Sequence, residues 1–216
     1  MKKDIAVIGL GTFGYELAVQ LAQEGHHILA IDMDMKIVND IKDQVDVAIQ
    51  ADITDPDVLK KLQIDQFDHV ILAMSSALEA IILGITYMKK MKVKNIIGKA
   101  NTHIQKEILL KIGADEVILP EIATAKRLAE RITHPGIVEK FNIDNKNALV
   151  EVKIPKKFHH KSIRELDLRK KYGLNVIMIS RNGKTEMISS PDIQFEPGDV
   201  ILVVGDELQI KKTLFD

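Results

Sequence analysis

The chain has 216 residues, enough for one large or two small domains, and 46% of them are apolar, so a substantial core can be buried. Its 30 basic and 31 acidic residues leave a formal charge of −1, which excludes a general attraction to nucleic acid or to an anionic membrane. The absence of cysteine excludes disulfides, thiolate metal sites and a cysteine nucleophile. Charged residues interrupt every long apolar run, and the amino terminus leads straight into a predicted strand. We therefore expect neither a membrane span nor a signal peptide.

Residues 5–14, IAVIGLGTFG, are typical of a buried parallel strand that turns through glycine into a helix. Gly9, Gly11 and Gly14 have the spacing G-x-G-x-x-G. In that motif the first glycine permits a tight turn, the second lets the backbone approach a pyrophosphate, and the third lets the helix pack closely. The predicted helix has a buried stripe that comprises Phe13, Leu17 and Leu21.

The second predicted strand, residues 27–31, ends at Asp32, 18 residues after Gly14. A carboxylate at about this distance from the glycines accepts hydrogen bonds from the ribose hydroxyls of an adenine nucleotide. It also repels a 2′-phosphate, which argues against NADP. The pattern favours an adenine nucleotide site over the alternative, in which the glycines only close a tight turn.

Strands and helices continue to alternate up to residue 133. Further strands are predicted over 45–51, 69–74, 95–100 and 116–119, and helices over 35–43, 58–62, 77–88, 102–112 and 121–132. Six strands alternating with helices predict an α/β fold with a doubly wound, Rossmann-like parallel sheet.

Polar side chains follow the strands at the edge where such sheets bind ligands. Asp52 lies where an adenine base would sit, although a helix N-cap fits as well, and Asp55 with Pro56 predicts a helix start. Ser75 is a candidate phosphate ligand, with helix capping as the simpler role. Lys99, inside a predicted strand, needs a phosphate or an acidic neighbour.

Proline and glycine at 133–136 predict a break between two domains, 1–133 and 137–216. In the second domain, strands are predicted over 148–154, 174–180, 185–188 and 199–205, with helices over 161–172 and 207–215. Two halves of about 35 residues, each the size of a βαβ unit, predict a small α+β domain without room for a large catalytic cavity.

Six ordered segments carry a resemblance to a known family. They are IAVIGLGTFG, IDMD at 31–34, DHVILAM at 68–74, KIGADEVILPE at 111–121, LDLRKKYGLNVIMISRNG at 166–183 and FEPGDVILVVG at 195–205. With them the chain resembles, over essentially its whole length, the cytosolic regulatory subunits of Ktr- and Trk-type potassium transport systems. Those subunits carry an RCK domain, with a TrkA-type nucleotide-binding half followed by a smaller half.

The resemblance implies a gating subunit rather than an enzyme. Such subunits bind ATP or ADP, and in some members NAD, in the first domain. They form dimers and octameric gating rings on the membrane subunit of the potassium transporter. The resemblance therefore implies a cytoplasmic protein that is peripheral to the inner face of the membrane, with no nucleic-acid partner.

The resemblance also implies site residues by position. Asp32 would hold the ribose, Asp34 and Asp52 would flank the adenosine, and Lys99 would face the phosphates. The residues around the phosphates would be Gly9, Gly11, Thr12, Phe13 and Gly14. Glu121 would help hold a divalent or monovalent cation at the dimer interface, or cap the next helix. A cyclic di-AMP site between two protomers would comprise Ile163, Arg169, Asn175 and Pro191.

Two departures from the family pattern leave the nucleotide preference open. Thr12 stands where many relatives have arginine, and Ser75-Ser76-Ala77 replaces a frequent glycine-glutamate-asparagine triplet. Without the guanidinium, a charge-assisted contact that could distinguish ATP from ADP is lost. Arg169 has its own alternative, a solvated helix end with two neighbouring lysines.

The alternative function is an NAD-dependent oxidoreductase. Such an enzyme needs a proton donor beside the nicotinamide. None of the seven histidines has an obvious orienting partner in the sequence, and there is no Tyr-x-x-x-Lys. These observations favour the regulatory subunit.

Overall fold

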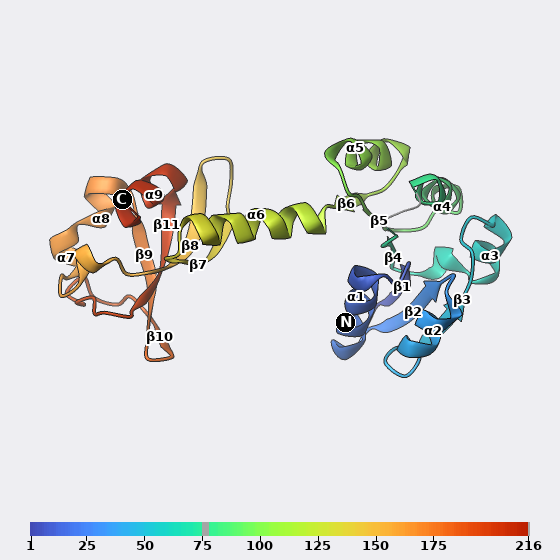
Figure 1. The fold of residues 1–216 in the computed structure, drawn as a ribbon, viewed down its shortest axis with the longest axis horizontal. Helices are drawn as coiled ribbons and strands as arrows, with labels where there is room; N and C mark the ends of the chain where they lie inside the picture. The colour runs from blue at the N-terminus through green and yellow to red at the C-terminus, as the bar shows by residue number, and fades with distance from the viewer. Residues whose placement is uncertain (75–77, 216) are drawn as a thin grey trace. The chain divides into compact units, whose positions relative to one another are not determined.

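The computed structural model describes residues 1–74 and 78–215, and the chain forms two compact units (Figure 1). The first unit is Met1–Ala123 and the second is Thr124–Asp216. The change from one unit to the next lies inside a helix, α6 (Pro120–Thr133), whereas the sequence pattern suggested a boundary after residue 133.

The first unit is the predicted doubly wound parallel sheet. Its strands are β1 (Asp4–Ile8), β2 (His27–Asp32), β3 (Val47–Gln50), β4 (His69–Leu72), β5 (Ile96–Lys99) and β6 (Glu116–Ile118), in the order β3-β2-β1-β4-β5-β6. Its helices are α1 (Thr12–Gln23), α2 (Met35–Ile41), α3 (Pro56–Lys61), α4 (Leu78–Lys90), α5 (His103–Ile112) and the start of α6, with a short 3-10 turn η1 (Ile64–Gln66). Every strand pair in this sheet is parallel. The strand order reverses between β1 and β4, where such folds bind ligands.

Helices on both faces bury the central strands completely. Along β1, Ala6 and Ile8 pack into a core with α4 and α5, while Ile5 and Val7 pack into a second core with α1 and α2. A strand buried on both faces needs apolar residues at every position, which explains the uninterrupted run at the start of the chain.

The stripe predicted for α1 is partly wrong. The fully buried residues of this helix are the small ones, Gly14, Ala18 and Val19, whereas Phe13, Leu17 and Leu21 are only half-buried. The helix lies close to the sheet at Gly14, so the side with small side chains faces inward.

The second unit is built on an antiparallel sheet, which confirms the α+β class but not the βαβ-sized halves. Its strands are β7 (Ile137–Asn142), β8 (Asn147–Lys153), β9 (Asn175–Arg181), β10 (Lys184–Met187) and β11 (Val200–Asp206), in the order β10-β9-β11-β8-β7. Its shorter elements are η2 (Lys156–Phe158), α7 (Ile163–Leu166), α8 (Leu168–Tyr172) and α9 (Glu207–Leu214). Strand β7 was not predicted. The helix predicted over 161–172 is divided at Asp167, whose φ of 47° is left-handed and ends α7.

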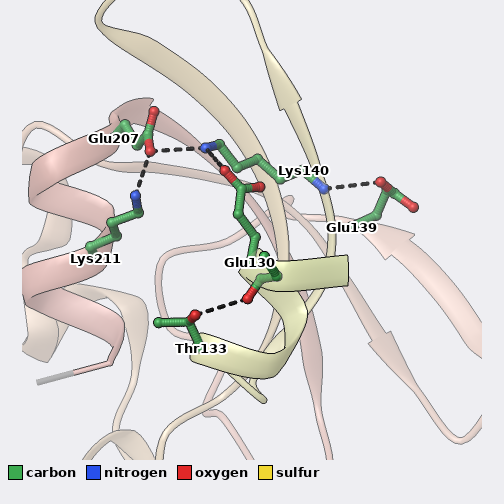
Figure 2. A network of polar contacts seen from close by, with 7 residues as sticks. Glu130, Thr133, Glu139, Lys140, Glu207 and Lys211 are labelled. Atoms are coloured by element: carbon green, nitrogen blue, oxygen red, sulfur yellow. Dashed lines mark hydrogen bonds and ion pairs between the residues drawn. The ribbon is translucent and has the colours of Figure 1, made fainter. Parts of the chain in front are cut away.

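A buried lysine in the second unit joins three of its elements (Figure 2). Lys140 Nζ on β7 lies 2.9 Å from Glu130 Oε1 on α6 and 2.8 Å from Glu207 Oε1 at the start of α9, and only 6% of the lysine side chain is exposed. Lys211 Nζ lies 2.6 Å from the same Glu207 oxygen. Hydrogen bonds from Lys140 and then Lys211 lower the pKa of Glu207 to about 2, although burial opposes this shift.

We expect Lys140→Met to lower the free energy of unfolding of the second unit by about 2–3 kcal/mol at pH 7, because two half-buried carboxylates lose their shared countercharge. The depressed pKa of Glu207 contributes stability that is complete above its ordinary pKa of 4.5 and is lost as the pH falls toward about 2. The difference between variant and wild type should therefore shrink in acid.

Urea unfolding would measure the change in the free energy of unfolding, and amide hydrogen exchange in β8 and β11 would report the stability of the second unit separately. Lys146→Met is the matched control, since that lysine is 75% exposed and lies 3.6 Å from Asp206, and it should change stability by less than about 0.5 kcal/mol. Equal stability of Lys140→Met and wild type at pH 7 would contradict the expectation.

Candidate functional site

A hollow of about 330 Å³ lies at the carboxyl ends of β1, β2 and β4, where the strand order reverses. Its charged lining residues are two carboxylates, Asp32 and Asp52. The remaining lining residues are apolar or glycine: Ile8, Gly9, Gly11, Ile31, Met33, Ile37, Ala51, Ile53, Ala73, Met74 and Ala80. An apolar hollow with a few convergent polar groups at this edge is the usual ligand site of a doubly wound sheet.

The three glycines of the first loop have different structural roles. Gly9 has a φ of 88°, and an added Cβ would lie 2.9 Å from the Met74 backbone nitrogen, so both conformation and space require glycine. A Cβ at Gly14 would collide with the Gly9 carbonyl oxygen, so α1 can approach the loop only with glycine there. Gly11 is the N-cap of α1, and an added Cβ would meet no atom within 4 Å. The backbone at Gly11 is therefore accessible to a ligand.

The start of α1 is suited to an anion. Within the described residues, no side chain caps this helix at Gly11. The first N–H groups of a helix lack partners inside the helix, and they carry the positive end of its dipole. A phosphate beside Gly11 would accept these hydrogen bonds.

Asp32 has a structural role and remaining capacity to bind. The Leu10 N–H donates to its Oδ2 (2.6 Å) and the Asp34 N–H donates to its Oδ1 (2.9 Å), so the carboxylate closes the glycine loop. A carboxylate offers about four acceptor positions, which leaves roughly two for ribose hydroxyls. Asp52 is also held, because its Oδ1 accepts from the N–H (2.9 Å) and the hydroxyl (2.8 Å) of Thr54. Asp55 and Pro56 begin α3, as predicted.

Several predicted residues lie elsewhere. Asp34 is the N-cap of α2, where it accepts from the Lys36 N–H at 2.8 Å. Thr12 is exposed at the first position of α1, and Phe13 lines a different hollow, with Leu17 and Leu21. Asp34, Thr12 and Phe13 are not among the described residues that line the first hollow. Ser75 lies outside the described residues.

Lys99 is paired with Glu121. Its side chain is 5% exposed, and Nζ lies 2.6 Å from Glu121 Oε1 in the first turn of α6. The hydrogen bond from Lys99 lowers the pKa of Glu121, and burial opposes this shift weakly. The partner that a buried lysine requires is thus the acidic one. Lys99 does not line the first hollow in the described part of the chain, so its contact with phosphates stays a prediction, as does a cation at Glu121.

The second unit has a hollow of about 450 Å³, which brings together all four residues of the implied cyclic di-AMP site. Its lining comprises Ile163, Arg164, Asp167, Leu168, Arg169, Lys170, Leu174, Asn175, Val176 and Pro191. The turn at Asp167 separates α7 from α8, and residues of both helices and of the start of β9 line this hollow. Backbone hydrogen bonds from Arg164 to Pro191 O (2.8 Å) and from Ile163 to Ile193 O (3.2 Å) attach the distant loop.

Sequence reasoning missed residues in both hollows. Met33 and Met74 line the first, and their positions one residue after β2 and two residues after β4 were a signal that could have identified them. Arg164 and Lys170 line the second. Arg164 is paired with Asp192, and this hydrogen bond raises the arginine pKa and lowers that of the acid. No pattern in the sequence links these two residues.

None of the helices formed by residues 1–74 and 78–215 is long and apolar enough to cross a membrane.

Comparisons with known proteins agree with this architecture. The TrkA-N domain family matches residues 5–120 and the TrkA-C domain family matches residues 148–214. Ktr system potassium uptake protein C of Bacillus subtilis is 34% identical over 213 residues, which cover 98% of this chain and 96% of the relative. Ktr system potassium uptake protein A of Vibrio alginolyticus is 32% identical over 214 residues, which cover 98% and 96%.

Solved structures show the same fold. The GsuK channel superimposes with a TM-score of 0.70 and 16% identity over 97% of this chain and 38% of that one. The TrkA-N domain of the Escherichia coli inner membrane protein ybaL superimposes with a TM-score of 0.54 and 17% identity, over 60% of this chain and 96% of that one. With both domain families matched in order and relatives aligned over nearly their whole length, the chain belongs to the TrkA-N and TrkA-C domain family that includes the Ktr system potassium uptake proteins A and C.

Proposed function

We propose that this chain is a non-enzymatic regulatory subunit that binds an adenine nucleotide in its first unit and controls a membrane potassium transporter. The observation that carries the proposal is the hollow beside Gly11, with Asp32 held at its edge, in a chain whose relatives are potassium uptake proteins. The partner would be the membrane subunit of a Ktr- or Trk-type system, which places the chain at the cytoplasmic face of the membrane.

The lining argues against the alternative, an NAD-dependent oxidoreductase. Reduction of a carbonyl at the nicotinamide requires a proton donor within hydrogen-bond reach. The described residues that line the first hollow include no histidine, tyrosine or lysine. The described lining therefore suits nucleotide binding better than hydride-transfer chemistry.

The charge of the first hollow bears on which nucleotide binds. The described lining carries two carboxylates and no cation, and residues 75–77 add no charge because they are Ser-Ser-Ala. The triphosphate of ATP and the diphosphate of ADP carry more negative charge than the two phosphodiesters of NAD. The helix N-terminus supplies only about half a positive charge. ATP or ADP binding should therefore depend on Mg²⁺ or on a cation from a second copy, and NAD binding should not.

Helix α6 supports self-association. None of its residues is buried, and its large apolar side chains are exposed, with Leu128 at 50% and Ile132 at 71%. A helix with one apolar side normally packs that side against a partner. We propose that a second copy covers it in a dimer, and that dimers assemble into the octameric gating ring. A cation at Glu121 would add to that dimer interface.

The second hollow supports a cyclic di-AMP site. Arg169 and Asn175 supply polar contacts, while Ile163 and Pro191 supply apolar ones, within one hollow. A cyclic dinucleotide on a two-fold axis would meet each of these residues twice, once from each protomer. Arg169 from both copies would then pair with the two phosphates.

We expect Asp32→Ala to weaken adenine nucleotide binding by roughly 1.5–3 kcal/mol, because the charged acceptor of the ribose hydroxyls is removed. Isothermal calorimetry with ATP, ADP and NAD, each with and without Mg²⁺, would measure this and test the charge argument. Asp55→Ala is the matched control, since it removes a helix-capping carboxylate outside the hollow. Unchanged affinity in a folded Asp32→Ala protein would place the nucleotide elsewhere.

The purified protein should be a dimer or a larger symmetric assembly, up to an octamer, because a ligand signal reaches a symmetric pore through a ring. Light scattering with and without nucleotide would measure the mass. Leu128→Glu should shift the distribution toward smaller species, since it places a charge on the apolar side of α6. A wild-type monomer at every concentration tested would argue against the gating proposal.

Arg169→Ala should abolish cyclic di-AMP binding while ATP or ADP binding in the first unit persists, because the two hollows share no lining residue. Calorimetry with both ligands on the full chain would separate the two effects. Lys171→Ala, a neighbouring cation that does not line the hollow, is the control. Undiminished cyclic di-AMP binding to Arg169→Ala would disprove the assignment.

A further inference from the structure

The second hollow contains an arginine whose plane is fixed by a neighbouring acid. Arg164, the second residue of α7, donates from Nε to Asp192 Oδ1 (2.7 Å) and from Nη2 to Asp192 Oδ2 (3.2 Å). Two parallel hydrogen bonds of this kind hold guanidinium and carboxylate in one plane. The backbone is fixed too, because the Arg164 N–H donates to Pro191 O at 2.8 Å. Arg164, which lines the hollow, thus presents a flat guanidinium whose plane is set by Asp192.

The other cations of this hollow are better placed to meet phosphates. The charge of Arg164 is already matched by Asp192, and two of its five N–H donors are used there. Among the described residues, no ion pair or side-chain hydrogen bond is found for Arg169 or Lys170, which line the same hollow. Ile163 and Pro191 add apolar surface to the lining of the same hollow. Flat and apolar surroundings suit a nucleobase rather than a phosphate.

We propose that the Arg164–Asp192 pair is a stacking platform for a purine base of the cyclic dinucleotide, with Arg164 contacting the base and Asp192 acting as a positioning residue. This inference rests on the proposed cyclic di-AMP site. A delocalised guanidinium stacks on aromatic rings, which an ammonium group cannot do equally well. A guanidinium that is already held in one plane also loses less freedom when the base binds.

Two substitutions separate stacking from simple charge. Arg164→Lys keeps the positive charge but removes the planar guanidinium. Asp192→Asn weakens the hydrogen bonds that position Arg164 and removes a negative charge near a dianionic ligand. The platform predicts weaker cyclic di-AMP binding in both, by about five- to tenfold for Arg164→Lys and about threefold for Asp192→Asn. A purely coulombic Arg164 predicts the opposite pattern: Arg164→Lys binds like wild type, and Asp192→Asn binds more tightly.

Calorimetry on the full chain would measure these affinities, and ultraviolet hypochromism of the bound adenine would report stacking directly. Hypochromism should be present in wild type and reduced in Arg164→Lys. Arg127→Lys is the matched control, because Arg127 is 64% exposed and lies 3.8 Å from Glu139 outside this hollow, so its affinity should equal that of wild type.

The outcomes distinguish failure of the stacking platform from failure of the proposed cyclic di-AMP site. Absence of cyclic di-AMP binding in wild type overturns the proposed site and the platform together. Wild-type binding accompanied by unchanged Arg164→Lys, or by tighter Asp192→Asn, overturns the platform alone. Both variants are exposed surface changes, and unchanged thermal unfolding would show that they fold.

Discussion

The close approach of the first loop to the end of β4 governs the architecture of the first hollow. Strand β1 is buried on both faces. At its end, Gly9 turns the chain directly beside the Met74 backbone. The Asp32 carboxylate then fixes the loop from the neighbouring strand through the Leu10 N–H. The backbone of the first loop and the Asp32 carboxylate are therefore held in position by contacts within the protein. A ligand that binds there does not have to order the loop first, which preserves affinity.

The two hollows have opposite charge, and this separates their ligands. The described lining of the first has two carboxylates and no cation, so the proposed nucleotide would be held there through its hydroxyls, with its phosphates at the backbone at the start of α1. The second is lined by Arg169 and Lys170 against one acid, Asp167, with Arg164 paired to Asp192, and this lining favours an anion. If both proposed ligands bind, the two sites have no lining residue in common and the ligands need not compete.

Local signals were sufficient to predict the first unit and insufficient for parts of the second. The alternation of apolar strands and helices up to residue 133 follows from neighbours in the sequence, and the observed sheet agrees with it. Strand β7 was missed because Lys140 interrupts its apolar pattern. This lysine is buried with Glu130 and Glu207 as partners, and Glu207 lies 67 residues away. The turn at Asp167 and the Arg164–Asp192 pair depend in the same way on contacts between distant residues.

Lys99 shows how far a sequence argument can reach. A buried lysine needs an anionic partner, so the sequence predicted one for Lys99. Whether that partner is a phosphate or a side chain depends on whether the start of α6 brings an acidic residue close to it. The structure brings a Glu121 oxygen to 2.6 Å from Lys99 Nζ, with the lysine side chain 5% exposed and the glutamate side chain 61% exposed. The buried charge is thus compensated without a ligand, and the exposed oxygens of Glu121 are still accessible. A cation at Glu121 would have to share that carboxylate with Lys99, so any such ion must bind strongly enough, or with enough additional ligands, to offset repulsion from the ammonium.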